Sequence, residues 1–446
     1  MKHFFTAIYI LLTSGFISAQ KIAKTNAIED LVFLNDAVTN GHPVNYDSTK
    51  SKVTLSEVVQ KLKNIDKDSF ELTEFRLLLN EAIYKIGCVH TRISNETIKT
   101  STTQKKYFPL ILTLRNGKLA DTLNNEIFSI NGISSQILIS DIEHFYASDG
   151  ITNALSTQVF YKNNSLLISK YFNFPNEYVV NSGNQTFALK ASKELPKSEV
   201  PFANNENSII FKNANNQFYT TDNIPILKIG SFYKNDKSLF QKSFDYLKKT
   251  NSACLIIDLR GNLGGNRKST IFLTKHLVHN SFSYSILQPK LNTKKYLDRK
   301  GKFFIFLSKL KYNVGNIFKG SRTELGREFA YNFKPLSNNF NGQIFVLTDG
   351  YTASASTMVT SWLKQHTKAK FIGQQSGGGY NGNNGGSFPT ITLPNSKYQI
   401  TFPAYRLILD RNSTQNEGII PDIIIEPIIG KDNVLTQTIQ LINSKN

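Results

Sequence analysis

The spacing of apolar residues predicts a helical region at the start of the chain. Between residues 26 and 88 the apolar positions recur every three or four residues, which is the period of an amphipathic helix. Three segments follow this pattern, and we expect one helix in each of residues 28–34, 55–62 and 70–86. Gly87 is a helix-stop signal, so His90 is expected on the loop or strand start that follows.

The pattern changes to short β-rich runs over residues 101–220. Asn-Gly pairs, which are typical of turns between such runs, occur at Asn116-Gly117 and Asn131-Gly132. The strands that we expect here cover residues 107–114, 126–130, 165–172 and 186–190. This part of the chain is therefore predicted to be a small, mostly β module.

Strands and helices alternate from about residue 224 onward. The expected strands are residues 226–229, 254–258 and 344–347, and the expected helices are residues 239–247 and 270–279. Such alternation predicts an α/β layer in which ligand-binding groups gather at the carboxyl ends of the strands. The predicted fold class is therefore an α/β domain with an N-terminal helical region and an inserted β-rich module. We assign residues 20–100 to the helical region, 101–220 to the module and 221–446 to the α/β domain.

The first twenty residues have the layout of a secretory signal peptide. Lys2 and His3 precede an apolar run that closes on Ser18-Ala19-Gln20. A membrane anchor is the weaker interpretation, because the run is shorter than the roughly 20 residues that a span needs. We expect residues 1–19 to be a signal peptide and the chain to be exported, either to the periplasm or out of the cell, without a membrane span.

The net charge of +19 is unevenly distributed along the chain. Residues 290–322 contain ten Lys or Arg against one acidic residue, Asp298, which gives a local charge of +9. No zinc finger, RNP signature or helix-turn-helix accompanies this segment, so we do not expect nucleic-acid binding. Two interpretations remain open: a solvated basic surface, or a rim beside a cleft that favours substrates presenting a carboxylate.

A strand, a tight turn and a helix start surround Ser354. The apolar run 344–347 meets a turn at Asp349-Gly350, and the small residues 352–356 then open an amphipathic helix. A hydroxyl on a first helical turn stands beside unpaired backbone N–H groups that can bind an oxyanion. Ser and Thr are also ordinary helix-start residues, and the Gly-x-Ser-x-Gly elbow is absent, so this segment needs partners from elsewhere in the chain.

Four stretches, taken in order, resemble the C-terminal processing, or tail-specific, serine peptidases. They are Gly87-Cys88-Val89-His90-Thr91, the glycine-rich run from Asp258 to Gly265, Thr352-Ala353-Ser354-Ala355-Ser356, and the run from Asn416 to Asp422. The resemblance implies that Ser354 is the nucleophile. It also implies an oxyanion hole made by the backbone N–H of Ala355 and one N–H from Gly264 or Gly265. Asn131-Gly132 resembles the start of the PDZ-like module found in many members.

The base lysine of the Ser-Lys members has no counterpart here. The aligned segment, about two dozen residues after the serine, reads Gly377-Gly378-Gly379-Tyr380. The chain is more similar to the branch of the tricorn core protease and the interphotoreceptor retinoid-binding protein, in which a histidine faces the serine. This implies that His90 is the base, with Glu417 as the residue that orients it. Val89 and Cys88, the two residues before His90, depart from the family pattern.

The resemblance implies an exported serine-type peptidase that acts on peptides or proteins, with no cofactor and no metal. A second hypothesis is a non-catalytic protein on the same scaffold that binds a peptide or an apolar ligand. Cys88 and Cys254 are too few for a disulfide framework and lack metal-ligand spacing. His276 and His279 have no motif around them, and we expect both at the surface.

Overall fold

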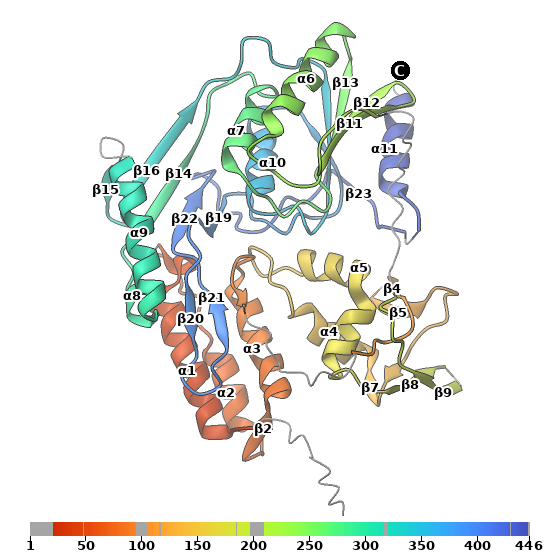
Figure 1. Ribbon diagram of the computed structural model, residues 1–446, viewed down its shortest axis with the longest axis vertical. Helices are drawn as coiled ribbons and strands as arrows, with labels where there is room; N and C mark the ends of the chain where they lie inside the picture. The colour runs from red at the N-terminus through yellow and green to blue at the C-terminus, as the bar shows by residue number, and fades with distance from the viewer. Residues whose placement is uncertain are drawn as a thin grey trace, which may run out of the picture.

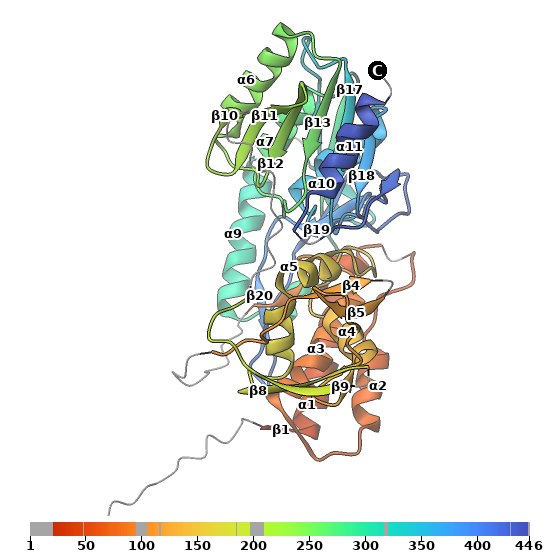
Figure 2. The same ribbon diagram turned by 90° about the vertical axis from the view of Figure 1, so that its right-hand side faces the viewer.

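The computed structural model describes residues 21–47, 49–94, 105–115, 117–183, 185–196, 209–315, 320–428 and 430–444. Figures 1 and 2 show an elongated molecule, with the N-terminal helices and the inserted module at one end and the large sheet at the other. The predicted signal peptide, residues 1–19, lies outside the described residues. Among the helices that the structure describes, none combines the length and apolar character needed to cross a membrane.

The three helices predicted at the start of the chain are confirmed. They are α1 (Lys24–Gly41), α2 (Ser56–Asn64) and α3 (Leu72–Ile86), accompanied by β1 (Lys21–Ala23), the 3-10 turn η1 (Pro43–Asn45) and β2 (Ser69–Glu71). Their apolar faces are buried in one cluster that includes Leu31, Leu62 and Leu79. Gly87 ends α3 in the left-handed conformation with φ 60°, which confirms the predicted stop.

The inserted module contains two helices besides its strands. The elements are β4 (Leu112–Arg115), β5 (Lys118–Asp121), β6 (Ser129–Ile130), β7 (Ile133–Ser134), α4 (Ser135–Glu143), α5 (Ala154–Tyr171), β8 (Glu177–Ser182) and β9 (Gln185–Lys190). Strands β7, β6, β8 and β9 form one sheet in this order, and β4 pairs with β5. The strand predicted for residues 165–172 is wrong, because almost all of this segment lies in α5. Ser165 and Ser169 form hydrogen bonds with the backbone of Phe108. This helix therefore buries polar as well as apolar residues, and its sequence does not show the helical spacing of apolar positions.

The α/β layer predicted for the second half is confirmed. Its sheet has the order β10-β11-β12-β13-β17-β18-β23, and the strands from β12 to β23 run parallel. The strands are β10 (Ile209–Lys212), β11 (Asn216–Thr221), β12 (Ile224–Ile229), β13 (Cys254–Asp258), β17 (Gln343–Thr348), β18 (Lys370–Gly373) and β23 (Ile423–Ile424). β10 and nearly all of β11 fall within the range 101–220 that we assigned to the module, but β10 pairs antiparallel with β11 and β11 with β12, so they belong to this sheet.

Helices cover both faces of the large sheet (Figure 1). α6 (Asp236–Lys249), α7 (Arg267–Lys275) and α10 (Ala355–His366) lie on one face, and α11 (Asn433–Asn443) lies on the other. Leu255 and Ile257 of β13 belong to the apolar cluster on the first face, whereas Ile256 packs with α11. This alternation along a strand buried on both faces explains its continuous apolar sequence.

A second sheet connects the two ends of the molecule. Its strands are β15 (Gly320–Thr323), β16 (Gly326–Phe333), β14 (Phe282–Pro289), β22 (Tyr405–Ile408) and β19 (Gly382–Gly385), in this order. A third, small sheet joins β20 (Thr390–Thr392) and β21 (Gln399–Thr401) to β3 (Arg92–Ile93), just after His90. The basic segment forms α8 (Thr293–Tyr296) and α9 (Arg299–Gly315) beside these strands.

The surface position predicted for His276 is wrong. The expected helix over residues 270–279 ends earlier, at Lys275, and the ring of His276 stacks on Phe244 with a centroid distance of 4.3 Å. Burial lowers the pKa of His276 to about 4. His279 is exposed, as expected. Both cysteines are free thiols.

Candidate active site

Ser354 occupies a strained turn between β17 and α10. It is the N-cap residue of α10, with φ 57° and ψ −118°, a conformation that a residue with a Cβ atom rarely adopts. The side chain of Ser354 is half-buried. A serine held on a sharp, strained turn from a strand into a helix is the arrangement of the nucleophile in the α/β-hydrolases, although the sequence motif of that fold is missing here.

Two glycines approach this turn so closely that no larger residue fits. A Cβ atom at Gly264 would lie 2.6 Å from the backbone nitrogen of Ala355 and 2.8 Å from Cβ of Ser354. On the other side, a Cβ atom at Gly378 would lie 3.1 Å from the backbone nitrogen of Ser354. The backbone N–H of Ala353 also donates to the carbonyl of Asn262 at 3.3 Å. The structure therefore places the glycine-rich loop 258–265 directly against the serine turn.

The backbone N–H groups around Ser354 differ in what they bind. The N–H of Gly264 donates to Oδ1 of Asn262 at 2.8 Å, so this predicted oxyanion donor is already engaged. Within the described part of the chain, the N–H groups of Gly265 and Ala355 have no hydrogen-bond acceptor. Of the three residues implied by the resemblance, Gly265 and Ala355 are thus the ones with an N–H available for an oxyanion.

Buried charges fix the start of the glycine-rich loop. Asp349 accepts hydrogen bonds from the backbone N–H of Gly261 at 3.0 Å and of Tyr351 at 2.9 Å, which joins the loop to the serine turn. Arg260 bridges Asp258, at the end of β13, and Asp432, at the start of α11. Burial alone would raise the pKa of Asp258, but the adjacent Arg260 lowers it overall, so the carboxylate stays charged.

The His90 loop is fastened to the loop that flanks Ser354 through one buried carboxylate. Oδ1 of Asp149 accepts from the N–H of Val89 at 3.0 Å, and Oδ2 accepts from the N–H of Gly379 at 3.1 Å. The N–H of Asp149 donates to the carbonyl of Gly377 at 2.8 Å. Burial raises the pKa of Asp149 to about 6, although the hydrogen bonds from Val89 and Gly379 lower it.

His90 is half-buried, with its Nδ1 atom shielded from solvent, and its ring is uncharged at neutral pH. Burial lowers the pKa of His90 to about 4, although a hydrogen bond to the backbone of Asn384 opposes the shift. Phe388 lies against the imidazole with a centroid distance of 5.0 Å. Nδ1 of His90 is buried and has no hydrogen-bond partner among the described residues. A neutral imidazole can accept a proton, and Nδ1 is the ring nitrogen left without a described partner.

Glu417 lies beside the same cluster but is exposed. A Cβ atom at Gly150 would lie 2.6 Å from Cγ of Glu417, and the N–H of Gly150 donates to the carbonyl of Gly87 at 3.1 Å. The carbonyl of Glu417 accepts from the N–H of Tyr380 at 2.9 Å. Asp149 and Gly150 therefore connect the loop before His90, the loop beside Ser354 and the Glu417 segment. No hydrogen bond between described residues joins the Glu417 carboxylate to the His90 ring.

Asp149 and the side chain of Asn262 were missed by the sequence reasoning. Asp149 belongs to a Ser-Asp-Gly turn sequence inside the module, far from every motif, and nothing local shows that its carboxylate is buried. Asn262 lies within the glycine-rich stretch that we identified, but its role as the acceptor for Gly264 depends on the folded loop.

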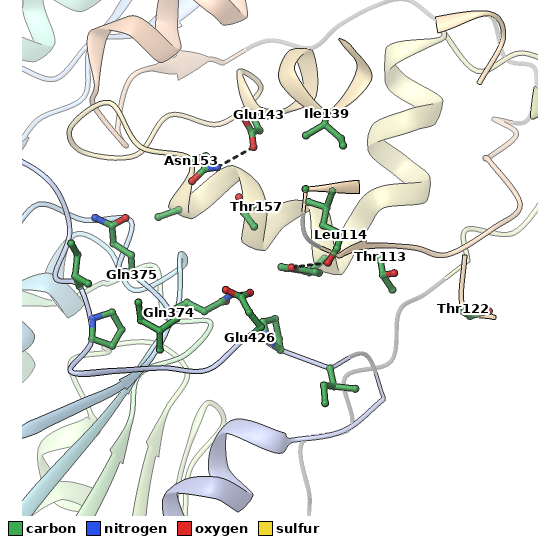
Figure 3. A pocket seen from close by; sticks show the side chains of 18 of the residues that line it. Thr113, Leu114, Thr122, Ile139, Glu143, Asn153, Thr157, Gln374, Gln375 and Glu426 are labelled. Atoms are coloured by element: carbon green, nitrogen blue, oxygen red, sulfur yellow. Dashed lines mark hydrogen bonds between the residues drawn. The ribbon is translucent and has the colours of Figure 1, made fainter. Parts of the chain in front are cut away.

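A cleft with a volume of about 990 Å³ lies between the inserted module and the large sheet (Figure 3). Thr113 and Leu114 from β4 and Glu143 from α4 face it on one side, and Gln374, Gln375 and Glu426 face it on the other. Ile424 of β23, the outermost strand of the large sheet, also lines it. Neither Ser354 nor His90 is among its lining residues, but Gln374 and Gln375 begin the loop that continues to Gly378 beside the serine.

Comparisons with known proteins agree with this architecture. Residues 223–425 match the model of Peptidase family S41. A mutant form of CPAF has a TM-score of 0.57 at 13% identity, covering 90% of this chain and 93% of that one. Mature CPAF in complex with lactacystin has a TM-score of 0.55 at 13% identity, over 90% of this chain and 94% of that one. A putative peptidase from Parabacteroides merdae has a TM-score of 0.48 at 14% identity, over 95% and 98%. No curated protein matches the sequence. At these identities the CPAF structures show a shared fold.

Proposed function

From the premise that residues 223–425 belong to peptidase family S41, we propose that this serine-type peptidase cleaves peptides or protein tails with Ser354 as nucleophile and His90 as base. The observation that supports it most strongly is the strained backbone of Ser354, at φ 57°, in contact with the glycine-rich loop. Strain of about 1–3 kcal/mol persists only where the surrounding structure enforces it, and it is concentrated at functional sites.

The proposed reaction begins when Oγ of Ser354 attacks the scissile carbonyl carbon. His90 accepts the hydroxyl proton as the Ser–C bond forms, and it later gives this proton to the leaving amine as the C–N bond breaks. The N–H groups of Gly265 and Ala355 bind the oxyanion of the tetrahedral intermediate. Water then attacks the acyl carbon and gives a proton to His90, which passes it to Oγ of Ser354 as the ester bond breaks and the carboxylic acid leaves.

The residues that align with the base lysine of the Ser-Lys members favour a histidine base. Residues 377–380 contain three glycines and a tyrosine, and this loop packs against the Ser354 turn with no room for a side chain at Gly378. His90, by contrast, is neutral above pH 4 and so has its lone pair available. We further propose that, when a substrate is bound, the ring carries its hydrogen on Nδ1 and donates it to Glu417, because that nitrogen has no other described partner. Nε2 then holds the lone pair that accepts the Ser354 proton.

The cleft in Figure 3 is the place that we propose for the substrate chain. β23 is the outer strand of the large sheet, and its two residues, Ile423 and Ile424, are 37% and 62% exposed. An extended peptide can add to such an edge through main-chain hydrogen bonds, with its side chains entering the cleft. We propose that the substrate approaches Ser354 along this edge. The pattern of residues 1–19 supports export as the route by which the enzyme meets it.

Steady-state peptide hydrolysis tests the proposed roles. Ser354→Ala and His90→Ala should each lower kcat by at least about 10³, because the nucleophile and its base act as one unit. Ser356→Ala is the matched control, since Ser356 follows two residues later in α10 and its hydroxyl is buried without a described partner. Hydrolysis that survives in Ser354→Ala, or is lost equally in Ser356→Ala, would contradict the assignment.

The preference for a free C-terminus can be measured separately. One peptide is offered as the free acid and as the C-terminal amide, each at low and high salt. A tail-specific enzyme cleaves the acid faster. Equal rates for both forms at both salt concentrations would show that the carboxylate is not recognised.

A further inference from the structure

Helix α9 packs on the protein with one narrow face. Gly301, Ile305 and Tyr312 are buried, and the ring of Tyr312 lies 5.0 Å from that of Tyr405 on β22. The hydroxyl of Tyr405 is hydrogen-bonded to Ser308 at 3.1 Å. Figures 1 and 2 show α9 as a long helix at the edge of the molecule, with its outer side facing away from the rest of the protein.

The outer face of α9 is apolar, which is unusual for a helix at the surface of a folded protein. Its large side chains are exposed by 45% to 62%, and they are Phe303, Phe304, Phe306, Leu307, Leu310 and Val314. Phe303, Leu307, Leu310 and Val314 follow one another at intervals of three or four residues, so they form one stripe along the helix. A contiguous exposed apolar stripe of this kind marks an interaction surface.

Basic residues lie along the stripe. Lys300, Lys302 and Lys311 are exposed, and none of them belongs to an ion pair of the described residues. The nearest acid, Asp298, is used at the start of the helix, where its Oδ1 accepts from the N–H of Gly301. The helix therefore combines an apolar face with uncompensated positive charge.

We propose that α9 docks the enzyme onto the surface of a membrane containing anionic lipids. A helix with aromatic and leucine side chains on one face and lysines beside it lies in the interface plane, with its apolar face at the boundary between headgroups and acyl chains. The lysine stems can extend along that boundary and place their ammonium groups among the phosphates.

Two other occupants fit the observations less well. A second copy of the chain, packed through the same helix about a twofold axis, would bring two segments of local charge +9 together and leave both uncompensated. A carboxylate-bearing substrate would account for the lysines but leave three exposed phenylalanines without a partner. An anionic lipid surface satisfies both the charge and the apolar stripe.

Sedimentation with lipid vesicles tests the proposal on the full chain. The protein should sediment with vesicles that contain phosphatidylglycerol and remain in solution with vesicles of phosphatidylcholine alone. Binding should weaken as salt is raised from 0.05 to about 0.5 M, because surface electrostatics are screened. Equal binding to both kinds of vesicle, or to neither, would overturn the proposal.

Two sets of variants separate the apolar and the charged contributions. Phe303→Ser with Phe306→Ser and Leu310→Ser should abolish vesicle binding, whereas the matched exposed set Leu123→Ser, Ile151→Ser and Val179→Ser should retain it.

Lys300→Glu with Lys302→Glu and Lys311→Glu should lower the partition coefficient by on the order of 100-fold or more, since one basic residue near an anionic surface contributes about fivefold. Lys242→Glu, Lys248→Glu and Lys249→Glu, on exposed positions of α6, make the same change of net charge elsewhere and should lower it far less.

If the α9 variants and their matched control variants lose vesicle binding to the same extent, for either the apolar or the charged pair of sets, docking through α9 is contradicted. A dimer that is broken by the phenylalanine variants, without any vesicle binding, would show that a second copy covers this face instead. Peptide hydrolysis in solution should be unchanged in the α9 variants, so a failure of docking is distinguishable from a failure of the proposed catalytic roles.

Discussion

The backbone of Ser354 leads to a prediction about stability that can be measured separately from activity. Ser354→Ala keeps a Cβ atom in the unfavourable region at φ 57°, whereas Ser354→Gly removes it. Strain at such a residue is about 1–3 kcal/mol. The free energy of unfolding of the glycine variant should therefore be larger than that of the alanine variant, by about 1 kcal/mol or more. Urea denaturation measures both, and neither variant should hydrolyse peptides.

Position 356 supplies the control, because it lies inside α10 with ordinary helical geometry. There the order should be reversed, with Ser356→Gly less stable than Ser356→Ala by about 1 kcal/mol. If glycine were also the less stable choice at position 354, the turn would not be strained and the main support for the nucleophile would be lost.

The buried imidazole of His90 predicts an unusual pH profile. Its pKa of about 4 means that the free enzyme keeps a neutral base as the pH falls through 6.5, the ordinary value for histidine, and loses it only near pH 4. The acid limb of kcat/KM should therefore have its midpoint near 4. A midpoint near 6.5 would mean that His90 is solvated in the working enzyme or is not the base.

At the residue scale, the sequence could predict partners that lie within a recognisable motif. The contact between Gly264 and the Ser354 turn belongs to this group. The carboxylate that holds the His90 loop does not, because Asp149 reaches Val89 and Gly379 across sequence separations of 60 and 230 residues. Such a partner is defined only once three distant segments have folded together.

At the scale of the elements, the site depends on how closely a loop can approach α10. A Cβ atom at Gly378 would lie 1.9 Å from Oγ1 of Thr357 and 2.9 Å from Cα of Ala353. Gly378→Ala must therefore push the loop away from the serine turn. We expect kcat/KM to fall by about 10² or more, since misplacement of catalytic groups by about 1 Å has effects of this size.

Gly385→Ala in β19 is the matched control for this loop. A Cβ atom there would make its nearest contact at 3.3 Å, with the side chain of Asn383, and the residue does not have a positive φ. It should leave kcat/KM within a few-fold of the unchanged enzyme. Comparable losses in both glycine variants would indicate a general sensitivity of the second sheet rather than a close approach at Ser354.

The elements themselves were predictable to different degrees. α1, α2 and α3 have one buried face each, and β13 is apolar up to its last residue, Asp258, so hydrophobic spacing identified them. α5 was mistaken in part for a strand because it is buried on several sides, with Asn164, Ser165 and Ser169 in contact with the chain around Phe108 and Leu112. A helix without a polar face gives no amphipathic signal.

At the scale of the whole molecule, contacts link four motifs between residues 87 and 422: the glycine-rich loop and Gly378 touch the Ser354 turn, and the His90 and Glu417 segments join the 376–379 loop. Their order in the sequence predicted that they belong together, but the sequence could not show how the inserted module closes the arrangement. Asp149 and Gly150 of the module touch the His90 loop, the 377–379 loop and the Glu417 segment. The module is thus part of the candidate active site as well as one wall of the large cleft.

The central claim is that Ser354 is an activated nucleophile, and covalent labelling tests it most directly. The enzyme is treated with a fluorophosphonate, digested, and the modified peptide is identified by mass spectrometry. We predict a single phosphonylated residue, Ser354, with the adduct absent from Ser354→Ala, strongly slowed in His90→Ala and unchanged in Ser356→Ala. An adduct on another serine, or complete inhibition of hydrolysis while Ser354 remains unmodified, would contradict the account.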